Sequence, residues 1–550
     1  MPGRPAELAV PCLVLKIRNF RAEKATIVTC NWFQEGRMRS MGVNFSGWVS
    51  AAIAVAMAAA GWAAGGEIEI RAVDQEDGKP VAVRMHLTHQ QGRSFLPKGS
   101  VQWKDPFVFA VKTVGEPPPG TYTFEMERGP EYHMRSGYFV MSRGATDNHQ
   151  VQMQRFVHMA REGWYSGDLH IHRRLEDVPL LMEAEDLHVA PVITWWNKKN
   201  CWQDEAIPER LTSTVGRDRF YNVMAGEDER AGGALLHFNL DAPKEHTLAT
   251  REFPSLVTFL KKEHQRKNEQ LHVDIEKPFW WDMPIWVASG MTHSMGLCHN
   301  HLWRNGVLDN EAWGKPRDTF SYPSPDGNGR WSQEIYYRLL NCGLRIPPSA
   351  GSASGVLPNP VGYNRVYVYC GEDFTYENWW AGLRAGRVVV TNGPMLRPRV
   401  NGELPGHVFT AKAGDTMELA AQLNLSLREK VKYLEIVKDG EVVHEVRLEE
   451  YAKAGGRLPA ITFDRSGWML IRAVTDNPKT FRFASTGPYY VEIGERPRIS
   501  REAVQFFLDW VHERARQIKL VDPEEQRRVL RYHRAARDFW QRRLAAANAD

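Results

Sequence analysis

Alternating hydrophobic and polar residues predict two β-rich regions, at residues 66–155 and 396–495. Alternation with a period of two is typical of strands that bury one face. Turn signals separate the alternating runs, so we expect a small β-sandwich in each region. The runs are 67–73, 121–126, 417–423 and 431–437, and the clearest turn signals are Asp77-Gly78 and Asp439-Gly440.

Between these regions, residues 156–395 mix strand and helix patterns. A strand pattern over 363–369 is followed by a helix pattern over 377–385, which Gly386 ends, and by a second strand pattern over 387–391. This strand–helix–strand order predicts an α/β layer structure. Residues 66–155 resemble the carboxypeptidase-regulatory-like modules found beside secreted hydrolases, and we expect this region to act as a scaffold.

Residues 496–550 predict a C-terminal helical tail. Ser500 is a suitable cap for a first helix, whose apolar face includes Val504, Phe507 and Val511. Asp522 is a suitable cap for a second helix, because Pro follows in the first turn and Glu525 stands three residues after the cap.

The first 65 residues predict an export leader. Arg37 and Arg39 precede the short apolar run 49–61, and small residues follow it. This order is typical of a signal peptide, and the run is shorter than the roughly 20 residues of a spanning helix. We therefore expect an exported protein, periplasmic or extracellular, without a permanent membrane span.

Composition excludes several classes of protein. With 550 residues, 43% hydrophobic and 25% charged, the chain is expected to fold into several units rather than remain disordered. Its net charge is +4, and residues 1–65 hold seven basic and three acidic residues, so the rest is neutral and predicts no nucleic-acid partner. The six cysteines form no CxxC pair, which argues against zinc ribbons; Cys201, Cys298, Cys342 and Cys370 either pair or remain free thiols.

The strongest chemical signal is Gly167-Asp168-Leu169-His170-Ile171-His172. On a strand, His170 and His172 point to the same face and supply half of a metal site, and Asp168 is placed to orient an imidazole. A cupin also uses His-x-His followed by a glutamate, for which Glu176 is suitably spaced. However, the residues after Glu176 predict a helix with Pro179 in its first turn, where a cupin needs a β-hairpin.

From Asp168 onward, the chain resembles the PHP superfamily (polymerase and histidinol phosphatase), especially its CehA/McbA-type metallohydrolases. The resemblance covers about 156–395. It rests on Asp168-x-His170-x-His172, Gly226-Glu227, His237, the segment 382–387 and Thr391-Asn392-Gly393-Pro394. It implies a distorted PHP-like (β/α)7 barrel with metal at one mouth. The expected domains are therefore a leader (1–65), a β-sandwich (66–155), the barrel (156–395), a second β-sandwich (396–495) and C-terminal helices (496–550).

The chain departs from the family pattern at three expected ligand positions. Trp196 replaces a histidine after the second strand, Lys277-Pro278 aligns with a His-Pro step, and residues 351–355 lack the family's late Asp and His. These departures favour one divalent ion (Zn, Mn or Fe) over a two- or three-metal centre. The candidate metal ligands are His170, His172, Glu227, His237, His299 and His301.

Other residues are candidates for chemistry around such an ion. Asp228, Asp282 and Lys277 are candidate catalytic residues, and Lys277, Arg173 and Arg365 are candidates for holding an anionic group. Trp195 and Trp196 are candidate walls of a substrate pocket. For the helical pair Trp379-Trp380, we expect core packing.

Three functions follow from these residues. The first is an exported metallohydrolase that acts on a phosphoester, carbamate, ester or amide in a small molecule or a surface polymer. The second is a degenerate barrel that binds a carbohydrate or an anion, because ligands are lost and tryptophans gained. The third is a glycoside hydrolase that uses Glu227, Asp228 or Asp282 as acid and base.

Overall fold

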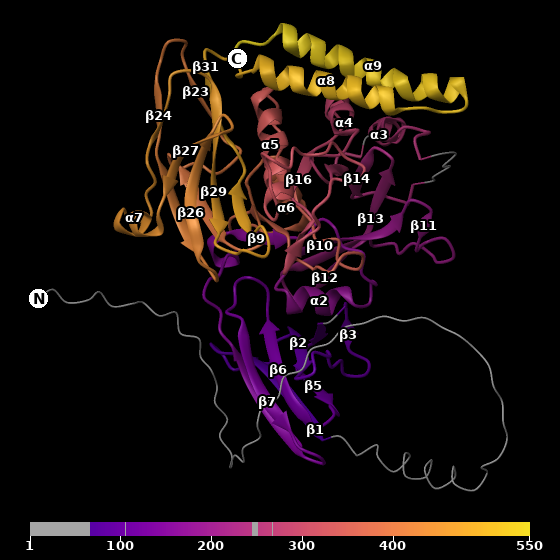
Figure 1. The fold of residues 1–550 in the computed structure, drawn as a ribbon, viewed down its shortest axis with the longest axis vertical. Coiled ribbons are helices and arrows are strands. Elements are labelled where there is room, and N and C mark those ends of the chain that lie inside the picture. The colour runs from indigo at the N-terminus through magenta and orange to yellow at the C-terminus, as the bar shows by residue number, and fades with distance from the viewer. Residues whose placement is uncertain (1–65, 105, 245–250, 267) are drawn as a thin grey trace, which may run out of the picture.

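The computed structural model describes residues 66–550 except residue 105, residues 245–250 and residue 267. In Figure 1, the N-terminal strands lie at one end of the molecule and the two C-terminal helices at the other. The predicted export leader, residues 1–65, lies outside the described residues. No helix in the described part of the chain has the length and apolar character needed to cross a bilayer.

Residues 67–153 form two sheets that share one hydrophobic core. The predicted alternation is confirmed in the first strand, where Ile68 and Ile70 are buried while Glu67 and Arg71 are exposed. The strand orders are β5-β1-β8 and β3-β4-β2-β6-β7. The strands are β1 (Glu67–Asp74), β2 (Val83–His89), β3 (Val101–Gln102), β4 (Phe107–Phe109), β5 (Lys112–Gly115), β6 (Gly120–Glu127), β7 (Arg135–Met141) and β8 (Thr146–Met153).

The central region is built on a mixed sheet. In it, β9 pairs in parallel with β10, β10 with β13, β15 with β16 and β16 with β19, whereas β13–β14, β14–β15, β9–β20 and β20–β21 are antiparallel. Its main strands are β9 (Trp164–Gly167), β10 (Val189–Trp196), β13 (Arg219–Arg230), β14 (Gly233–Phe238), β15 (His272–Ile275), β16 (Ser294–Cys298), β19 (Pro348–Ala350), β20 (Arg365–Tyr369) and β21 (Val388–Thr391). Short strands are β11 (Lys199–Asn200), β12 (Thr212–Val215), β17 (Leu302–Trp303) and β18 (Gly306–Val307).

Helices cover this sheet. The predicted helix after Pro179 is α2 (Val178–Ala184), and the predicted helix near 377–385 is α6 (Tyr376–Arg384), on which Trp379 and Trp380 are buried in the core as expected. The other helices of the region are η1 (Ala160–Glu162), α3 (Leu256–Gln265), α4 (Met283–Ser289) and α5 (Gly327–Asn341).

Residues 395–493 are β-rich, and their strands are hydrogen-bonded to the central sheet through the β21–β30 pair. The hairpin predicted at Asp439-Gly440 is confirmed: it joins β26 to β27, and both residues have the positive φ (51° and 98°) that such a tight turn needs. The strands are β22 (Met395–Val400), β23 (Val408–Ala411), β24 (Met417–Leu419), β25 (Ala421–Ser426), β26 (Val431–Lys438), β27 (Glu441–Val446), β28 (Ile461–Phe463), β29 (Gly467–Thr475), β30 (Phe483–Thr486) and β31 (Tyr489–Ile493), with helix α7 (Leu448–Lys453).

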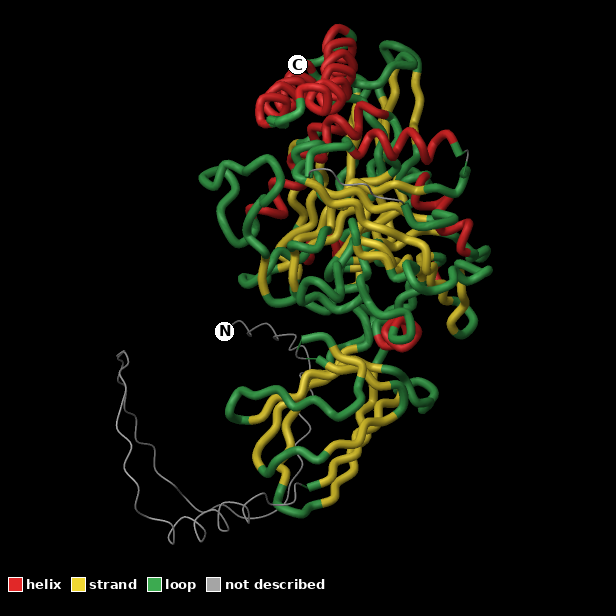
Figure 2. The backbone as a smooth tube through the Cα atoms, turned by 90° about the vertical axis from the view of Figure 1, so that its right-hand side faces the viewer, coloured by secondary structure: helices red, strands yellow, loops and turns green. Residues whose placement is uncertain are grey.

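The two predicted C-terminal helices are present as α8 (Arg501–Gln517) and α9 (Pro523–Ala545). Both predicted caps are confirmed, since Ser500 accepts the N–H of Ala503 and Asp522 accepts that of Glu524. The pair packs on the central region opposite the N-terminal strands, as the tube view shows (Figure 2). The fold is therefore mixed α/β, with eight α-helices in the described residues. The four cysteines in that part of the chain are free thiols.

Candidate metal centre

The His-x-His segment follows β9 and lies between β10 and residues 351–355. Ile171 forms bridges to Val192 on one side and to Ser354 on the other, so both imidazoles project from the same side of the segment. Gly351 makes a close approach possible here, because a Cβ at this position would lie 2.5 Å from the Cβ of His170.

Asp168 holds the backbone of this segment. Its buried carboxylate accepts the N–H groups of His170 (3.0 Å), Ser352 (2.9 Å) and Gly362 (2.7 Å). Sequence reasoning expected Asp168 to orient an imidazole. In the structure, Asp168 instead ties the His-x-His segment to the 351–362 loop. It thereby fixes the position of the backbone from which both histidine side chains project.

His170, His172 and Glu227 converge on one point. The two Nε2 atoms lie 3.0 Å apart, and Oε2 of Glu227 lies 3.4 Å from Nε2 of His170 and 3.1 Å from Nε2 of His172. Glu227 reaches this point from β13, whose register places it beside Trp196 of β10 and Leu236 of β14. These three residues form the one cluster of potential metal ligands found among the described residues.

The donor set fits a divalent ion. A tetrahedral ion with bonds of about 2.0–2.1 Å holds its ligand atoms about 3.3 Å apart. The three observed separations, 3.0, 3.1 and 3.4 Å, bracket that value. Two imidazole nitrogens and one carboxylate oxygen suit Zn, Mn or Fe, and three protein ligands leave a position open.

A buried glutamate supports His170 from its other side. Oε1 of Glu276 lies 3.3 Å from Nδ1 of His170. The second oxygen of Glu276 accepts the indole N–H of Trp280 at 3.0 Å and pairs with the ammonium of Lys277, which lies over the Trp280 ring. A carboxylate behind a metal-binding histidine fixes the orientation of the ring and leaves Nε2 as the donor.

The electrostatics of the cluster favour a cation at its centre. Burial lowers the pKa of His170, but the charges of Glu227 and Glu276 outweigh burial and raise this pKa to about 10. Burial raises the pKa of Glu227, yet the two histidines lower it below its usual range. The two carboxylates thus stabilise positive charge between them.

Asp274, two residues before Glu276, borders a cavity of about 10 Å³ beside His170. Burial raises the pKa of Asp274 to about 7, although the hydroxyls of Ser294 and Ser349 donate to its carboxylate. The cavity is close to the smallest volume that holds one water molecule, about 10–15 Å³.

The other predicted metal ligands lie outside the cluster. His237 stands opposite Gly226 rather than Glu227, so it projects from the other face of the sheet, against Trp195 (5.8 Å between rings) and the ammonium of Lys244 (2.8 Å). His299 follows β16, and its Nε2 contacts the hydroxyl of Ser332 at 2.8 Å.

His301 packs near His299, with 5.5 Å between the ring centroids. Burial, together with the charge of Lys277, lowers the pKa of His299 to about 3. Burial and Lys277 also lower the pKa of His301 well below its usual value. Both rings are therefore neutral neighbours of the site.

The predicted catalytic carboxylates are engaged elsewhere. Asp228 is fully buried and accepts Nε of Arg230 at 2.7 Å. Asp282 precedes α4 and accepts Nε of Arg514 in α8 at 2.7 Å, which ties the C-terminal helices to the central region. Of the three predicted catalytic residues, Lys277 is the one that contacts Glu276, the carboxylate beside His170.

The predicted substrate-binding residues are dispersed. The Arg173 guanidinium donates to the carbonyl of Gln102 in β3, and buried Arg365 donates to backbone carbonyls of Gly362 and Glu185. Trp195 is buried over Gly226.

Trp196 lies at the site. The centroid of its ring is 5.1 Å from that of His172, and the ammonium of Lys199 lies 5.2 Å from a ring centroid of Trp196. Unlike Trp195, the Trp196 side chain is not fully buried. It thus borders the partly exposed side of the cluster, at His172.

Sequence reasoning missed Glu276 and Asp274. The signal that identifies them is Asp274-Ile275-Glu276 at the end of the short buried strand β15, because carboxylates at i and i+2 of an extended segment point to the same face. Two acidic side chains directed into a protein interior need partners, and this need indicates a site.

Comparisons with known proteins add no family. No protein-family model matches the chain, and no curated protein matches it. Among solved structures, phospholipase PlaB from Legionella pneumophila is similar over 18% of this chain and 26% of its own, at 14% identity and a TM-score of 0.13. This similarity is too small to carry an argument about fold or function.

Proposed function

We propose that this protein is a hydrolase that uses one divalent metal ion held by His170, His172 and Glu227. The observation that carries the proposal is the convergence of these three donor atoms within 3.0–3.4 Å of one another. When bound, such an ion lowers the pKa of a water molecule toward about 7 and so supplies a nucleophile at neutral pH.

The surrounding residues have distinct tasks in this proposal. Glu276 holds the proton on Nδ1 of His170 and thereby presents Nε2 as a donor. Lys277 neutralises Glu276 and adds positive charge beside the site, which favours substrates that carry or develop negative charge. Trp196 gives an apolar wall next to His172, on the partly exposed side of the cluster.

These features suit a phosphoester, carbamate, ester or amide, since each develops negative charge on oxygen when water attacks. The order of the motifs along the chain supports a PHP-like relationship. We propose that the strands from β9 to β21 are the counterpart of the family's distorted (β/α)7 barrel, with the cluster at the mouth where β13 and β15 end. Export of the mature chain remains part of this proposal.

The contacts that the candidate carboxylates make favour metal-dependent hydrolysis over glycoside hydrolysis. Glu227 faces two histidines, Asp228 pairs with Arg230, and Asp282 pairs with Arg514. A glycosidase needs two carboxyl groups that flank an open site, about 5–10 Å apart. Neither aspartate has the freedom that this role requires.

The test combines metal analysis with hydrolysis. Purified full-length protein should hold about one equivalent of Zn, Mn or Fe, and should hydrolyse chromogenic phosphoesters or aryl esters in a reaction that a chelator stops. His170→Ala and His172→Ala should lose both the metal and the activity, whereas His237→Ala, a buried histidine on the other face of the sheet, should keep the metal. Wild-type protein that takes up no metal would refute the proposal. Metal binding without hydrolysis of any substrate class would favour the binding role instead.

A further inference from the structure

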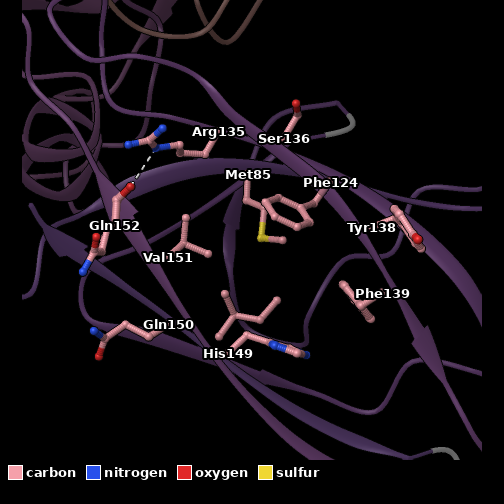
Figure 3. Close-up of a pocket in the computed structure, with 12 residues that line it drawn as sticks. Met85, Phe124, Arg135, Ser136, Tyr138, Phe139, His149, Gln150, Val151 and Gln152 are labelled. Atoms are coloured by element: carbon pink, nitrogen blue, oxygen red, sulfur yellow. Dashed lines mark hydrogen bonds between the residues drawn. The ribbon is translucent and has the colours of Figure 1, made fainter. Parts of the chain in front are cut away.

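The N-terminal sandwich contains a cavity of about 320 Å³ that no step of the proposed reaction uses. It lies between β7 and β8, the edge strands of the two sheets. Figure 3 shows Met85 and Phe124 at its centre, with Val151 and His149 across from them. The volume is within the range of small-molecule sites, about 300–1,000 Å³.

The cavity is bounded at both ends of the two edge strands. At one end, β7 continues directly into β8 through residues 142–145. At the other end, Tyr132 forms a bridge with Arg155, and the N–H of His133 donates to the carbonyl of Gln154 at 2.9 Å. Between these ends, the described residues of β7 and β8 form no backbone ladder with each other. The opening is therefore short, which favours a compact ligand over a peptide strand that runs through.

The interior of the cavity is apolar because the inward side chains are small or hydrophobic. Gly137 faces Phe124 across the β6–β7 pair, and a Cβ at Gly137 would lie 2.9 Å from the Phe124 ring. Phe124 and Val151 point into the sandwich but are only partly buried, because the sheets separate beside them. Their exposed surface lines the cavity.

One cation stands at the edge of this apolar space. Arg135 alternates with Gly137 and Phe139 along β7, so it projects to the same side as they do. Within the described residues, its guanidinium donates to neutral oxygens, namely the carbonyl of Gln152 (2.8 Å) and the side chains of Gln75 (3.2 Å) and Gln154 (3.3 Å). Figure 3 shows the contact with Gln152 at the cavity. An anion placed here would meet a positive charge that forms no ion pair with a carboxylate of the described residues.

We propose that this cavity binds a small amphipathic anion, such as a medium-chain or aryl carboxylate. The apolar part lies on Met85, Phe124 and Val151, and the carboxylate lies at Arg135. A sandwich module expected to be a scaffold would then carry a ligand site of its own, at the opposite end of the molecule from the C-terminal helices (Figure 1). This proposal does not depend on the metal centre.

The test uses full-length protein and 8-anilinonaphthalene-1-sulfonate, an aryl anion that fluoresces in apolar sites. Octanoate should displace it with saturation, and 1-octanol should do so at least threefold less well. Val151→Phe, which fills the cavity, should weaken octanoate binding at least tenfold. The matched variant Val140→Phe adds the same atoms to the outer face of β7, where Val140 is 60% exposed, and should bind within twofold of wild type. Arg135→Met should weaken octanoate at least threefold without changing octanol, whereas Arg143→Met in the exposed β7–β8 turn should change neither.

Three results would overturn the proposal. They are a wild-type protein that octanoate does not saturate, equal octanoate binding by Val151→Phe and Val140→Phe, and equal affinities of wild type for octanoate and octanol. Thermal unfolding of each variant shows whether it is folded. If Val151→Phe is not, Val151→Met replaces it: weaker octanoate binding supports the proposal, and unchanged binding refutes it.

Discussion

Replacing Glu276 tests whether metal affinity at the proposed centre depends on the carboxylate behind His170 as well as on the three ligands. Glu276 does not belong to the three-residue cluster, but its Oε1 lies 3.3 Å from Nδ1 of His170. Glu276→Gln removes the negative charge behind the imidazole and replaces one of the two acceptor oxygens by an N–H donor, while it keeps the size of the side chain. Loss of such a partner typically weakens metal binding 10- to 100-fold. This loss corresponds to about 1.4–2.8 kcal/mol of binding free energy.

Lys277 complicates the single variant. Its ammonium is buried and paired with Glu276, and removal of one member of a buried ion pair destabilises a protein by about 3–5 kcal/mol. The double variant Glu276→Gln/Lys277→Met removes both charges together and avoids an unpaired ammonium. We expect it to be more stable than Glu276→Gln alone and still to bind zinc at least 10-fold more weakly than wild type.

The assay is competition for zinc against a chromogenic chelator, with thermal unfolding as a second readout. At zinc equal to 100 times the wild-type Kd, binding stabilises wild type by about 2.7 kcal/mol. A variant with a 100-fold weaker Kd gains about 0.4 kcal/mol at the same zinc concentration. The control is Glu229→Gln, two residues beyond the ligand Glu227 on β13, which removes a nearby charge without touching His170. A double variant that binds zinc within twofold of wild type would refute the role of Glu276.

Three further predictions concern other parts of the chain. Burial lowers the pKa of His188 to about 4, whereas the unfolded chain binds this proton near pH 6.5. The free energy of unfolding should therefore fall by up to about 3 kcal/mol as the pH drops from about 6.5 to about 4. His188→Gln should remove this pH dependence, as measured by urea unfolding over the same pH range. Gly226→Ala would place a Cβ 1.7 Å from the Trp195 ring, so it should lower stability by about 3 kcal/mol or more and weaken zinc binding at the adjacent ligand; a wild-type Tm would contradict this. Asp282→Asn should remove one of the two carboxylates that pair with Arg514, the other being Glu252, and lower the unfolding free energy by about 1.5–3 kcal/mol with zinc affinity retained; loss of zinc affinity at unchanged stability would contradict the structural role.

Local patterns predicted local structure well. The caps Ser500 and Asp522 and the turn at Asp439-Gly440 are present where their residue types predicted them, because each depends on contacts within a few residues. The same is true of His170 and His172, whose i, i+2 spacing alone places both on one side of an extended segment. Predictions that need only near neighbours do not depend on the rest of the fold.

His237 shows where a further step of sequence reasoning was possible. The hairpin between β13 and β14 turns at Ala231-Gly232, so Arg230 pairs with Gly233 and Glu227 pairs with Leu236. Residues opposite each other share a face, and their neighbours point to the other face. A two-residue loop at this position would therefore have assigned His237 to the face opposite Glu227.

The residues that hold the two histidines in place, Glu276 and the loop 351–362, were not predictable in this way. Glu276 lies 106 residues along the chain from His170, and the loop 351–362 that Asp168 holds is almost 200 residues away. Their proximity depends on the order in which β15, β16 and β19 join the sheet, which no local pattern specifies. The carboxylates at Asp274 and Glu276 signal a buried polar site, but not which histidine they face.

The position of Lys277 supports the proposal of one ion over two at this centre. The resemblance to the PHP superfamily aligns Lys277 with a ligand histidine, and the structure instead pairs the Lys277 ammonium with Glu276 beside His170. Two unit charges 4 Å apart interact with about 4 kcal/mol at an effective dielectric constant of 20. The Lys277 ammonium would therefore repel a second divalent ion placed 4 Å from it by about 8 kcal/mol. Lys277 already supplies the positive charge that Glu276 needs. The replacement of a histidine by Lys277 thus agrees with the proposal of one ion, for which His170, His172 and Glu227 are the ligands.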